Sequence, residues 1–254
     1  MNRQSGKHYF SNKLVEFRHS LSFIDALPQL TLLGFFVGLV TGVIIVSFRL
    51  LIDLPLAQLL PGNSENFEAL PLQHRLMFIA SGIIFLTGFL LLFKEKDREM
   101  SVSHVLDRTH NFQAKLPIKN WWVQFVGAIV ALASGQSVGR EGPVVHLGAG
   151  AASLFGQWLR LPNNSTQTLV GCGVAAAISA SFDTPMAGVI FAMEILALEY
   201  TIVGFLPIIL ASVMGTVVSQ AVLTDAGFIN VGETNLRSLY EIPFMVVVGF
   251  VIAI

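Results

Sequence analysis

Residues 134–148 read Ser-Gly-Gln-Ser-Val-Gly-Arg-Glu-Gly-Pro-Val-Val-His-Leu-Gly and lie between two apolar segments. The glycines on either side of the Arg-Glu pair permit backbone angles that other residues avoid. Pro143 suits the first turn of a helix, where its missing N–H costs no hydrogen bond. No charged residue follows until Arg160. The stretch therefore predicts a helix that begins near Glu141 and enters apolar surroundings, with its amino end inside the protein.

The amino end of a helix in such surroundings favours an anion. Its first backbone N–H groups have no partner inside the helix, and the aligned peptide dipoles place about half a positive charge there. Glu141 adds a carboxylate beside this site. A side-chain anion can occupy an anion site, block it, and leave when it is protonated, so Glu141 is a candidate gate. The alternative is that Arg140 and Glu141 form a solvated ion pair at a membrane interface.

Composition places the whole chain in a membrane. Its 254 residues are 54% hydrophobic and only 12% charged, whereas soluble domains average about 25% charged residues. The formal net charge of −1 offers no basic face, so no nucleic-acid partner is expected. Cys172 is the only cysteine, which excludes an intrachain disulfide and a thiolate cluster for zinc or iron–sulfur chemistry. We expect an all-α integral membrane protein.

Uncharged segments long enough to span a membrane lie on both sides of residues 134–148. A transmembrane helix needs about 20 mainly apolar residues. Residues 30–48 and 76–93 meet this requirement, and residues 201–224 and the segment from residue 242 onward are further candidates. The chain is therefore expected to cross the membrane several times.

Residues 121–200 differ from these segments, because glycine, proline and isolated ionisable residues repeatedly interrupt their apolar runs. We expect short, tilted or broken helices there. Unpaired backbone groups at such breaks are tolerated at membrane depth only where they are buried in protein or line a wet cavity. The interruptions therefore indicate a pathway through the membrane.

Basic residues set the expected orientation. Residues 1–28 form a leader in which basic charge predominates, without the apolar core of a signal peptide. Residues 94–119 contain a second group of basic residues, and two predicted spans separate the two groups. Both groups then lie on one side of the membrane, which the positive-inside rule identifies as the cytoplasm. The connector at residues 52–74 is expected outside.

Three blocks of sequence resemble one family of membrane transporters. Residues 139–148 are similar to the sequence around the gating glutamate of the ClC chloride channels and chloride/proton antiporters. Residues 171–177, Gly-Cys-Gly-Val-Ala-Ala-Ala, and residues 181–194, which include Asp-Thr-Pro-Met-Ala-Gly, resemble the next two blocks of the same half. Three blocks in order are more specific than any one of them.

The resemblance implies a ClC-like inverted-repeat fold, in which broken and tilted helices direct their amino ends at chloride. It also implies a homodimer in a bacterial plasma membrane. The backbone amides of Arg140, Glu141 and Gly142 would contribute to the anion site that Glu141 gates. Residues 29–254 would form the first inverted half and the opening helix of the second. ClC membrane domains are nearly twice this long, so we expect a truncated chain that holds half a pathway. No cofactor is implied.

Two departures from the family sequence concern the anion and the proton. The family element Gly-Ser-Gly-Ile-Pro, whose serine holds the central chloride, is absent. Ser101 or Ser103 offers a hydroxyl in its place, although such serines ordinarily cap helices. Ile195 stands where proton-coupled members commonly carry an inner acid. Because isoleucine carries no proton, this position favours an uncoupled channel or a protein that moves protons through other residues, such as Glu194 or Glu199.

The expected function is passive or gated transport of chloride or a similar small anion across the lipid bilayer. A different broken-helix carrier, in which Arg140 binds a carboxylate substrate directly, is the alternative within transport. A non-conducting membrane module that needs a partner half is the alternative from another class. No enzyme activity and no metal site are expected, because His104, His110 and His146 have no second ligand at metal spacing and no His-Glu-x-x-His is present.

Overall fold

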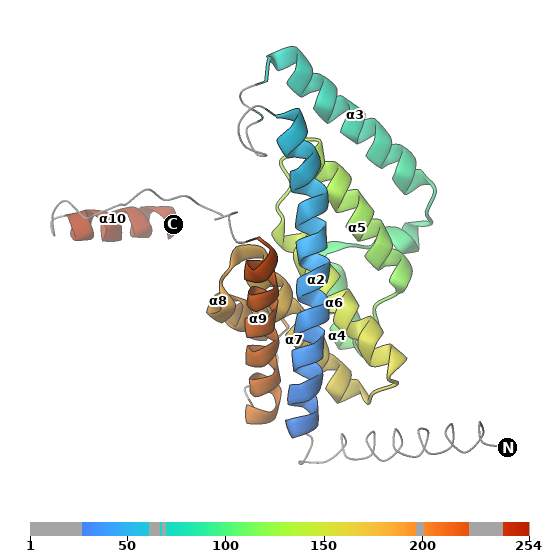
Figure 1. Cartoon of the computed structure of the whole chain (residues 1–254), viewed down its shortest axis with the longest axis vertical. Helices are drawn as coiled ribbons and strands as arrows, with labels where there is room; N and C mark the ends of the chain where they lie inside the picture. Colours follow the sequence, from blue (N-terminus) through green and yellow to red (C-terminus); the bar gives the residue numbers. More distant parts are fainter. Residues whose placement is uncertain (1–26, 61–66, 68–69, 197–200, 224–240, 254) are drawn as a thin grey trace. The chain divides into compact units, whose positions relative to one another are not determined.

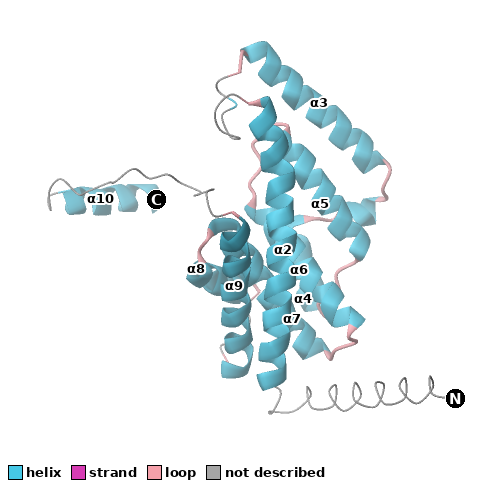
Figure 2. Cartoon of the chain, in the orientation of Figure 1, coloured by secondary structure: helices cyan, strands magenta, loops and turns pink. Residues whose placement is uncertain are grey.

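The computed structural model describes residues 27–60, 67, 70–196, 201–223 and 241–253. Within these ranges the regular structure is helical throughout, without a strand (Figure 2), so the all-α prediction is confirmed. By their contacts the residues divide into a unit of residues 1–224 and a unit of residues 225–254.

The helices of the first unit follow one another through short connections. They are α2 (Leu27–Leu59), α3 (Leu72–Leu91), the short 3₁₀ helix η3 (Glu95–Arg98), α4 (Ser101–Asn111), α5 (Ile118–Ala133), α6 (Glu141–Trp158), α7 (Asn163–Phe182), α8 (Pro185–Ile195) and α9 (Ile202–Val222). The second unit contains α10 (Glu241–Ala253).

Helix α7 forms the centre of the first unit. It packs against α2, α6, α8 and α9, and every one of residues 169–181 is buried. Most of these residues are glycine, alanine, serine or cysteine, so neighbouring backbones approach closely. A Cβ atom on Gly173 would meet the backbone of Gly148 on α6, and a Cβ atom on Gly215 of α9 would meet the carbonyl oxygen of Ala176. Small side chains thus hold the core together by backbone contact.

Helix α9 lies beside the amino-terminal part of α2 (Figure 1). Gly34 and Gly38, one turn apart on α2, face α9. A Cβ atom on Gly38 would lie 2.5 Å from the carbonyl oxygen of Ala211, and one on Gly34 would lie 2.7 Å from the carbonyl oxygen of Pro207. The two helices therefore pack as closely as their backbones allow.

The predicted helix breaks are present in residues 121–200. They fall at residues 134–140, 159–162 and 183–184. At the last of these, Asp183 adopts the left-handed conformation with φ 56°, and α8 begins with proline, which needs no hydrogen-bond acceptor there. The prediction of short, broken helices is confirmed.

Helices long and apolar enough to cross a bilayer occupy Leu27–Leu59, Leu72–Leu91 and Gly204–Val222 among the described residues. They agree with three of the predicted spans, and α10 falls in the fourth apolar segment. Helix α3 packs chiefly on α5 and buries only Gly82, so most of its apolar surface faces outward. The chain is a multi-pass membrane protein. The predicted leader lies almost wholly outside the described residues, because their description begins at residue 27.

Candidate anion-binding site

Helix α6 begins at Glu141, as the sequence predicted. Arg140 occupies the cap position, and its side chain makes no capping hydrogen bond to the first turn. The Glu141 carboxylate turns back over the preceding loop, because a Cβ atom on Gly139 would lie 2.5 Å from Glu141 Oε2. Glycine at position 139 therefore leaves room for this carboxylate beside the amino end of the helix.

The first turn of α6 is less enclosed than the sequence suggested. Glu141 is exposed and Arg140 is half-buried, whereas residues 143–153 are all buried. The expectation that the amino end lies inside the protein is therefore wrong for the described part of the chain. The physical reason is that α4, α5 and α7 cover α6 from Pro143 onward and leave one side of its start open. An enclosed anion site at this position needs a second wall.

Ser101 lies beside the start of α6. It is the first residue of α4, with a left-handed φ of 74°, and its N–H donates to Gln124 Oε1 at 3.0 Å. A Cβ atom on Gly142 would lie 2.9 Å from Ser101 Oγ. The cap residue of α4 is Met100, and no side chain caps the helix from that position, so the capping interpretation of Ser101 is wrong. Ser103 lies on an exposed face of α4.

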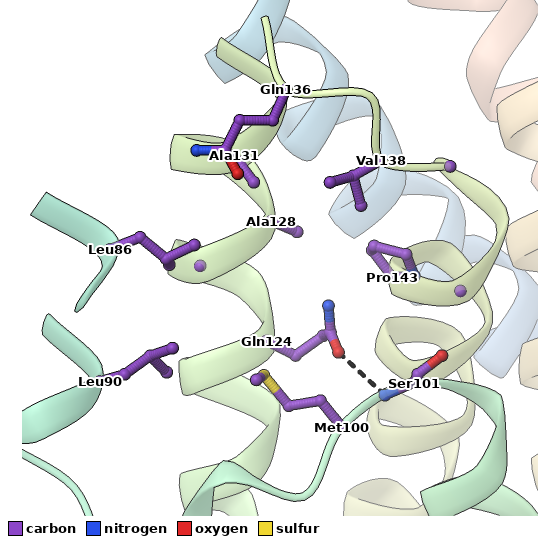
Figure 3. Close-up of a pocket in the computed structure, with 13 residues that line it drawn as sticks. Leu86, Leu90, Met100, Ser101, Gln124, Ala128, Ala131, Gln136, Val138 and Pro143 are labelled. Atoms are coloured by element: carbon purple, nitrogen blue, oxygen red, sulfur yellow. Dashed lines mark hydrogen bonds between the residues drawn. The ribbon is translucent and has the colours of Figure 1, made fainter. Parts of the chain in front are cut away.

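A cavity of about 460 Å³ lies where the starts of α4 and α6 meet α3 and α5 (Figure 3). Its lining residues are Leu86, Leu90, Met100, Ser101, Gln124, Gly127, Ala128, Ala131, Gln136, Val138, Gly139, Gly142 and Pro143. In Figure 3, Ser101 and Pro143 lie on one side of α5 and the leucines of α3 lie on the other, and the Ser101 hydroxyl points away from α5. The wall is mainly apolar, with polar groups from one serine and two glutamines.

The cavity brings together part of the predicted anion site. Ser101 and Gly142 line it, and they come from two different helix starts. Arg140, Glu141 and Ser103 are not among its lining residues. The cavity therefore presents a hydroxyl and the amino end of α6, while the candidate gate lies at its margin, next to Gly139.

One polar cluster of the first unit was not predicted as a pair. His104 Nδ1 and His146 Nε2 are 2.9 Å apart, and their rings stack with centroids 5.2 Å apart. Both histidines are buried. The sequence treats them as separate residues because they lie on α4 and α6, and only packing brings them together. In the part of the chain that is described, no group of three or more His, Cys, Asp and Glu side chains is placed to hold a metal ion.

Position 195 and the two acids near it, Glu194 and Glu199, are far in sequence from His104 and His146. Ile195 is the last residue of α8 and is partly buried. Glu194 beside it is exposed in the described chain, and Glu199 lies outside the described residues. The effect of Ile195 on proton movement stays a prediction.

Residues 135–139 also match the hydrolase pattern Gly-x-Ser-x-Gly formally. In a hydrolase the serine of this pattern sits at a sharp turn between a strand and a helix. Here Ser137 lies in an exposed connection between the two helices α5 and α6. The structural context of a nucleophilic serine is therefore not met at this position.

Comparison with known proteins identifies the chain. The family model for voltage-gated chloride channels matches residues 82–254, which include both helix starts at the cavity. The chain belongs to this chloride channel family. The ClC resemblance of its sequence is thereby confirmed.

Relatives and solved structures agree with this ClC membership. The H⁺/Cl⁻ exchange transporter ClcA of Yersinia pseudotuberculosis is 26% identical over 222 residues, covering 85% of this chain and 46% of the relative. A CLC-type fluoride/proton antiporter structure is 26% identical, with a TM-score of 0.70 over 90% of this chain and 55% of that chain. A slow cyanobacterial Cl⁻/H⁺ antiporter matches in fold, with a TM-score of 0.69 and 21% identity over 88% of this chain and 54% of that chain. The chain thus spans about half the length of the ClcA relative.

Proposed function

We propose that this ClC-family chain contributes to a pathway for chloride or a similar small anion. The observation that carries the proposal is the meeting of two helix starts at one cavity, where the Ser101 hydroxyl lies beside Gly142 of α6. A hydroxyl and the amino end of a helix both donate hydrogen bonds to an anion. One relative is named as a chloride/proton exchanger and one as a fluoride/proton antiporter, and these names support a halide as the transported ion.

Glu141 is the proposed gate, and the amides of Arg140, Glu141 and Gly142 are the proposed anion ligands. The carboxylate lies at the start of α6 and turns toward Gly139, a cavity-lining residue. A carboxylate and a halide compete for one positive helix end, so the anionic side chain excludes the ion and the protonated side chain admits it. The gate therefore opens as the pH falls.

A second wall completes the site in this proposal. Glu141 is exposed on the open side of α6, and an anion in contact with bulk water gains little from a helix end. Residues 29–254 are proposed to form the first inverted half and the opening helix of the second, and a matching half supplies the opposing helix ends. A homodimer is also proposed. Met186 and Ile190 of α8, 66% and 57% exposed, offer part of an apolar face for a second copy.

Halide flux from liposomes tests the transport proposal. Protein expressed from the whole gene is reconstituted with chloride or fluoride inside, and the external halide is followed with an ion-selective electrode. Flux above that of protein-free liposomes is expected. A membrane module without transport activity gives none, and such a result overturns the proposal. Inhibition of chloride flux by acetate or succinate would instead favour a carboxylate carrier that uses Arg140.

The proposed location is the plasma membrane of a bacterium, with the amino terminus in the cytoplasm. It rests on the basic residues before the first predicted span and after the second, and on the bacterial sources of the relatives.

A further inference from the structure

His104 and His146, called the histidine pair below, belong to a buried chain of polar groups that leads from Arg108 on α4 to α6. Arg108 Nε donates to His104 Nε2 at 3.2 Å, and His104 Nδ1 lies 2.9 Å from His146 Nε2. His146 is 0% exposed, and its Nδ1 has no hydrogen-bond partner among the described residues. A buried polar atom without a partner costs about 1–3 kcal/mol, so a purely structural pair would be an unfavourable choice at this depth.

The donor at Arg108 fixes the direction of the whole chain. A guanidinium has donors only, so His104 Nε2 must accept and His104 Nδ1 must carry the proton. That proton is donated to His146 Nε2. His146 is then protonated at Nδ1, the atom that has no partner. The neutral pair therefore has a bare nitrogen at the Arg108 end and an N–H at the buried end.

Glu99 connects the pair to the surface. Its Oε2 lies 3.7 Å from His104 Nε2 and 3.9 Å from an Arg108 terminal nitrogen, and its side chain is 53% exposed whereas that of His104 is 2% exposed. Glu99 follows the basic residues of η3, which the positive-inside rule places in the cytoplasm. A proton from the cytoplasm therefore meets an exposed carboxylate next to the bare nitrogen of His104.

Other charged groups near the pair are few. Arg108, Glu99 and Asp107 act on His104, and His104 is the charge neighbour of His146. The helices that pack against α6 carry further ionisable residues, which are Arg49 and Asp53 on α2, His110 on α4, Lys119 on α5 and Cys172 on α7. Arg108 is thus the positive group that acts on the pair, and Glu99 and Asp107 are the compensating anions.

The pair also lies close to the proposed anion site. His104 is three residues after Ser101 on α4, and His146 is four residues after Gly142 on α6. Both histidines are therefore about one helical turn beyond the two helix starts at the cavity. Glu141 precedes His146 by five residues, which is about 7.5 Å along the helix axis.

We propose that His104 and His146 form an internal proton-transfer site between Glu99 and the gate Glu141. The inference deepens the proposed anion transport and rests on it. A proton from Glu99 binds His104 Nε2 as Arg108 Nε moves away. The Nδ1–H bond of His104 then breaks as an N–H bond forms at His146 Nε2, and His146 releases its Nδ1 proton through water to the Glu141 carboxylate. One proton enters and one leaves, and each histidine is left with its proton on Nε2. The first arrangement returns when each ring exchanges this proton with water for one at Nδ1, because ring rotation does not interchange the two nitrogens.

This route accounts for the residue at position 195. Isoleucine there cannot carry a proton, yet the relatives named above exchange protons for halide. The histidine pair supplies titratable groups on α4 and α6 without any acid at the end of α8. The proton path of this chain is therefore assigned to α4 and α6, and not to α8, which ends at Ile195.

Proton movement driven by a chloride gradient tests the inference. The protein expressed from the whole gene, the double variant His104→Gln and His146→Gln, and the variant Glu99→Gln are reconstituted into liposomes. External pH and external chloride are recorded together. We expect the wild-type protein to move protons against their gradient, the double variant to move chloride with proton movement reduced to that of empty liposomes, and Glu99→Gln to slow the protons while chloride flux is retained.

His110→Gln provides the matched control, because His110 lies exposed on the same helix, outside the pair. It is expected to keep the wild-type ratio of protons to chloride. Wild-type chloride flux without proton movement would overturn the inference and leave the anion proposal intact, as would an unchanged ratio in the double variant. Absence of chloride flux from the wild-type protein would instead overturn the anion proposal. Glutamine keeps a hydrogen bond between the helices, and Glu99→Gln leaves the pair untouched if the double variant fails to fold.

Discussion

Glu141 is the residue whose charge should control the anion pathway. Replacement of Glu141 by glutamine keeps its size and removes its titration, so flux is expected to persist and to become independent of pH. Wild-type flux should rise as the pH falls, because protonation removes the negative charge that competes with the anion for the helix end. Liposome flux at several pH values measures both.

Glu95→Gln is the control for this prediction, because Glu95 is an exposed acid on η3. It should keep the pH dependence of the wild-type protein. A Glu141→Gln variant that retains the wild-type pH profile would show that another group is the gate.

Ser101 is expected to act on the anion through its hydroxyl. Ser101→Ala removes a donor beside Gly142 and leaves the backbone hydrogen bond to Gln124 in place. A hydrogen bond to a charged group contributes about 1.5–3 kcal/mol, so half-saturation of chloride flux should require roughly ten- to a hundredfold more chloride. Ser103→Ala, on the exposed face of α4, should change nothing. Equal effects from the two variants would contradict the assignment.

Single residues differ in how well the sequence predicts them. The start of α6 at Glu141 follows from local chemistry, since glycine and proline act on their own backbone. The approach of Ser101 to Gly142 and the contact of His104 with His146, which are 42 residues apart, depend on how α4 packs on α6. No local pattern encodes such a contact, so the histidine pair could not be predicted as a pair.

At the scale of elements, α2 and α9 are held together by glycine. Gly38→Ala places a methyl group about where the carbonyl oxygen and Cα of Ala211 already lie, at 2.5 and 2.7 Å. Overpacking of this kind costs about 1–3 kcal/mol, because the backbone must move. The detergent-solubilised variant should lose its monodisperse gel-filtration peak at a lower temperature than the wild-type protein.

Gly88→Ala on α3 is the matched control, because a Cβ atom there meets nothing within 4 Å. Its melting temperature should stay at the wild-type value or rise slightly, since alanine favours helix. If Gly38→Ala and Gly88→Ala had the same melting temperature, close contact between α2 and α9 would not be a determinant of stability.

Elements were predicted best where composition alone defines them. The apolar runs of α2 and α3 and the breaks marked by proline are visible in the sequence because lipid and backbone chemistry dictate them directly. The open start of α6 was predicted wrongly, because the absence of charge after Pro143 says nothing about which neighbours cover the residues before it.

For the whole molecule, the buried thiol permits a test of orientation. Cys172 is 0% exposed, so the native chain should not react with a membrane-impermeant maleimide. Gln73→Cys, at the exposed start of α3, should be labelled on intact cells, whereas Lys96→Cys, on exposed η3, should be labelled only after the membrane is opened. Labelling of Lys96→Cys from outside would reverse the proposed topology.

The length of α2 brings the surrounding lipid into the behaviour of the protein. Its 33 residues extend about 50 Å, whereas the hydrocarbon core of a bilayer is about 30 Å thick. A helix of this length must tilt strongly or reach beyond the acyl chains at one end. Because α2 is locked to α9 by backbone contact, its tilt cannot change alone. Acyl-chain length is therefore a variable through which the membrane acts on the packing of these two helices.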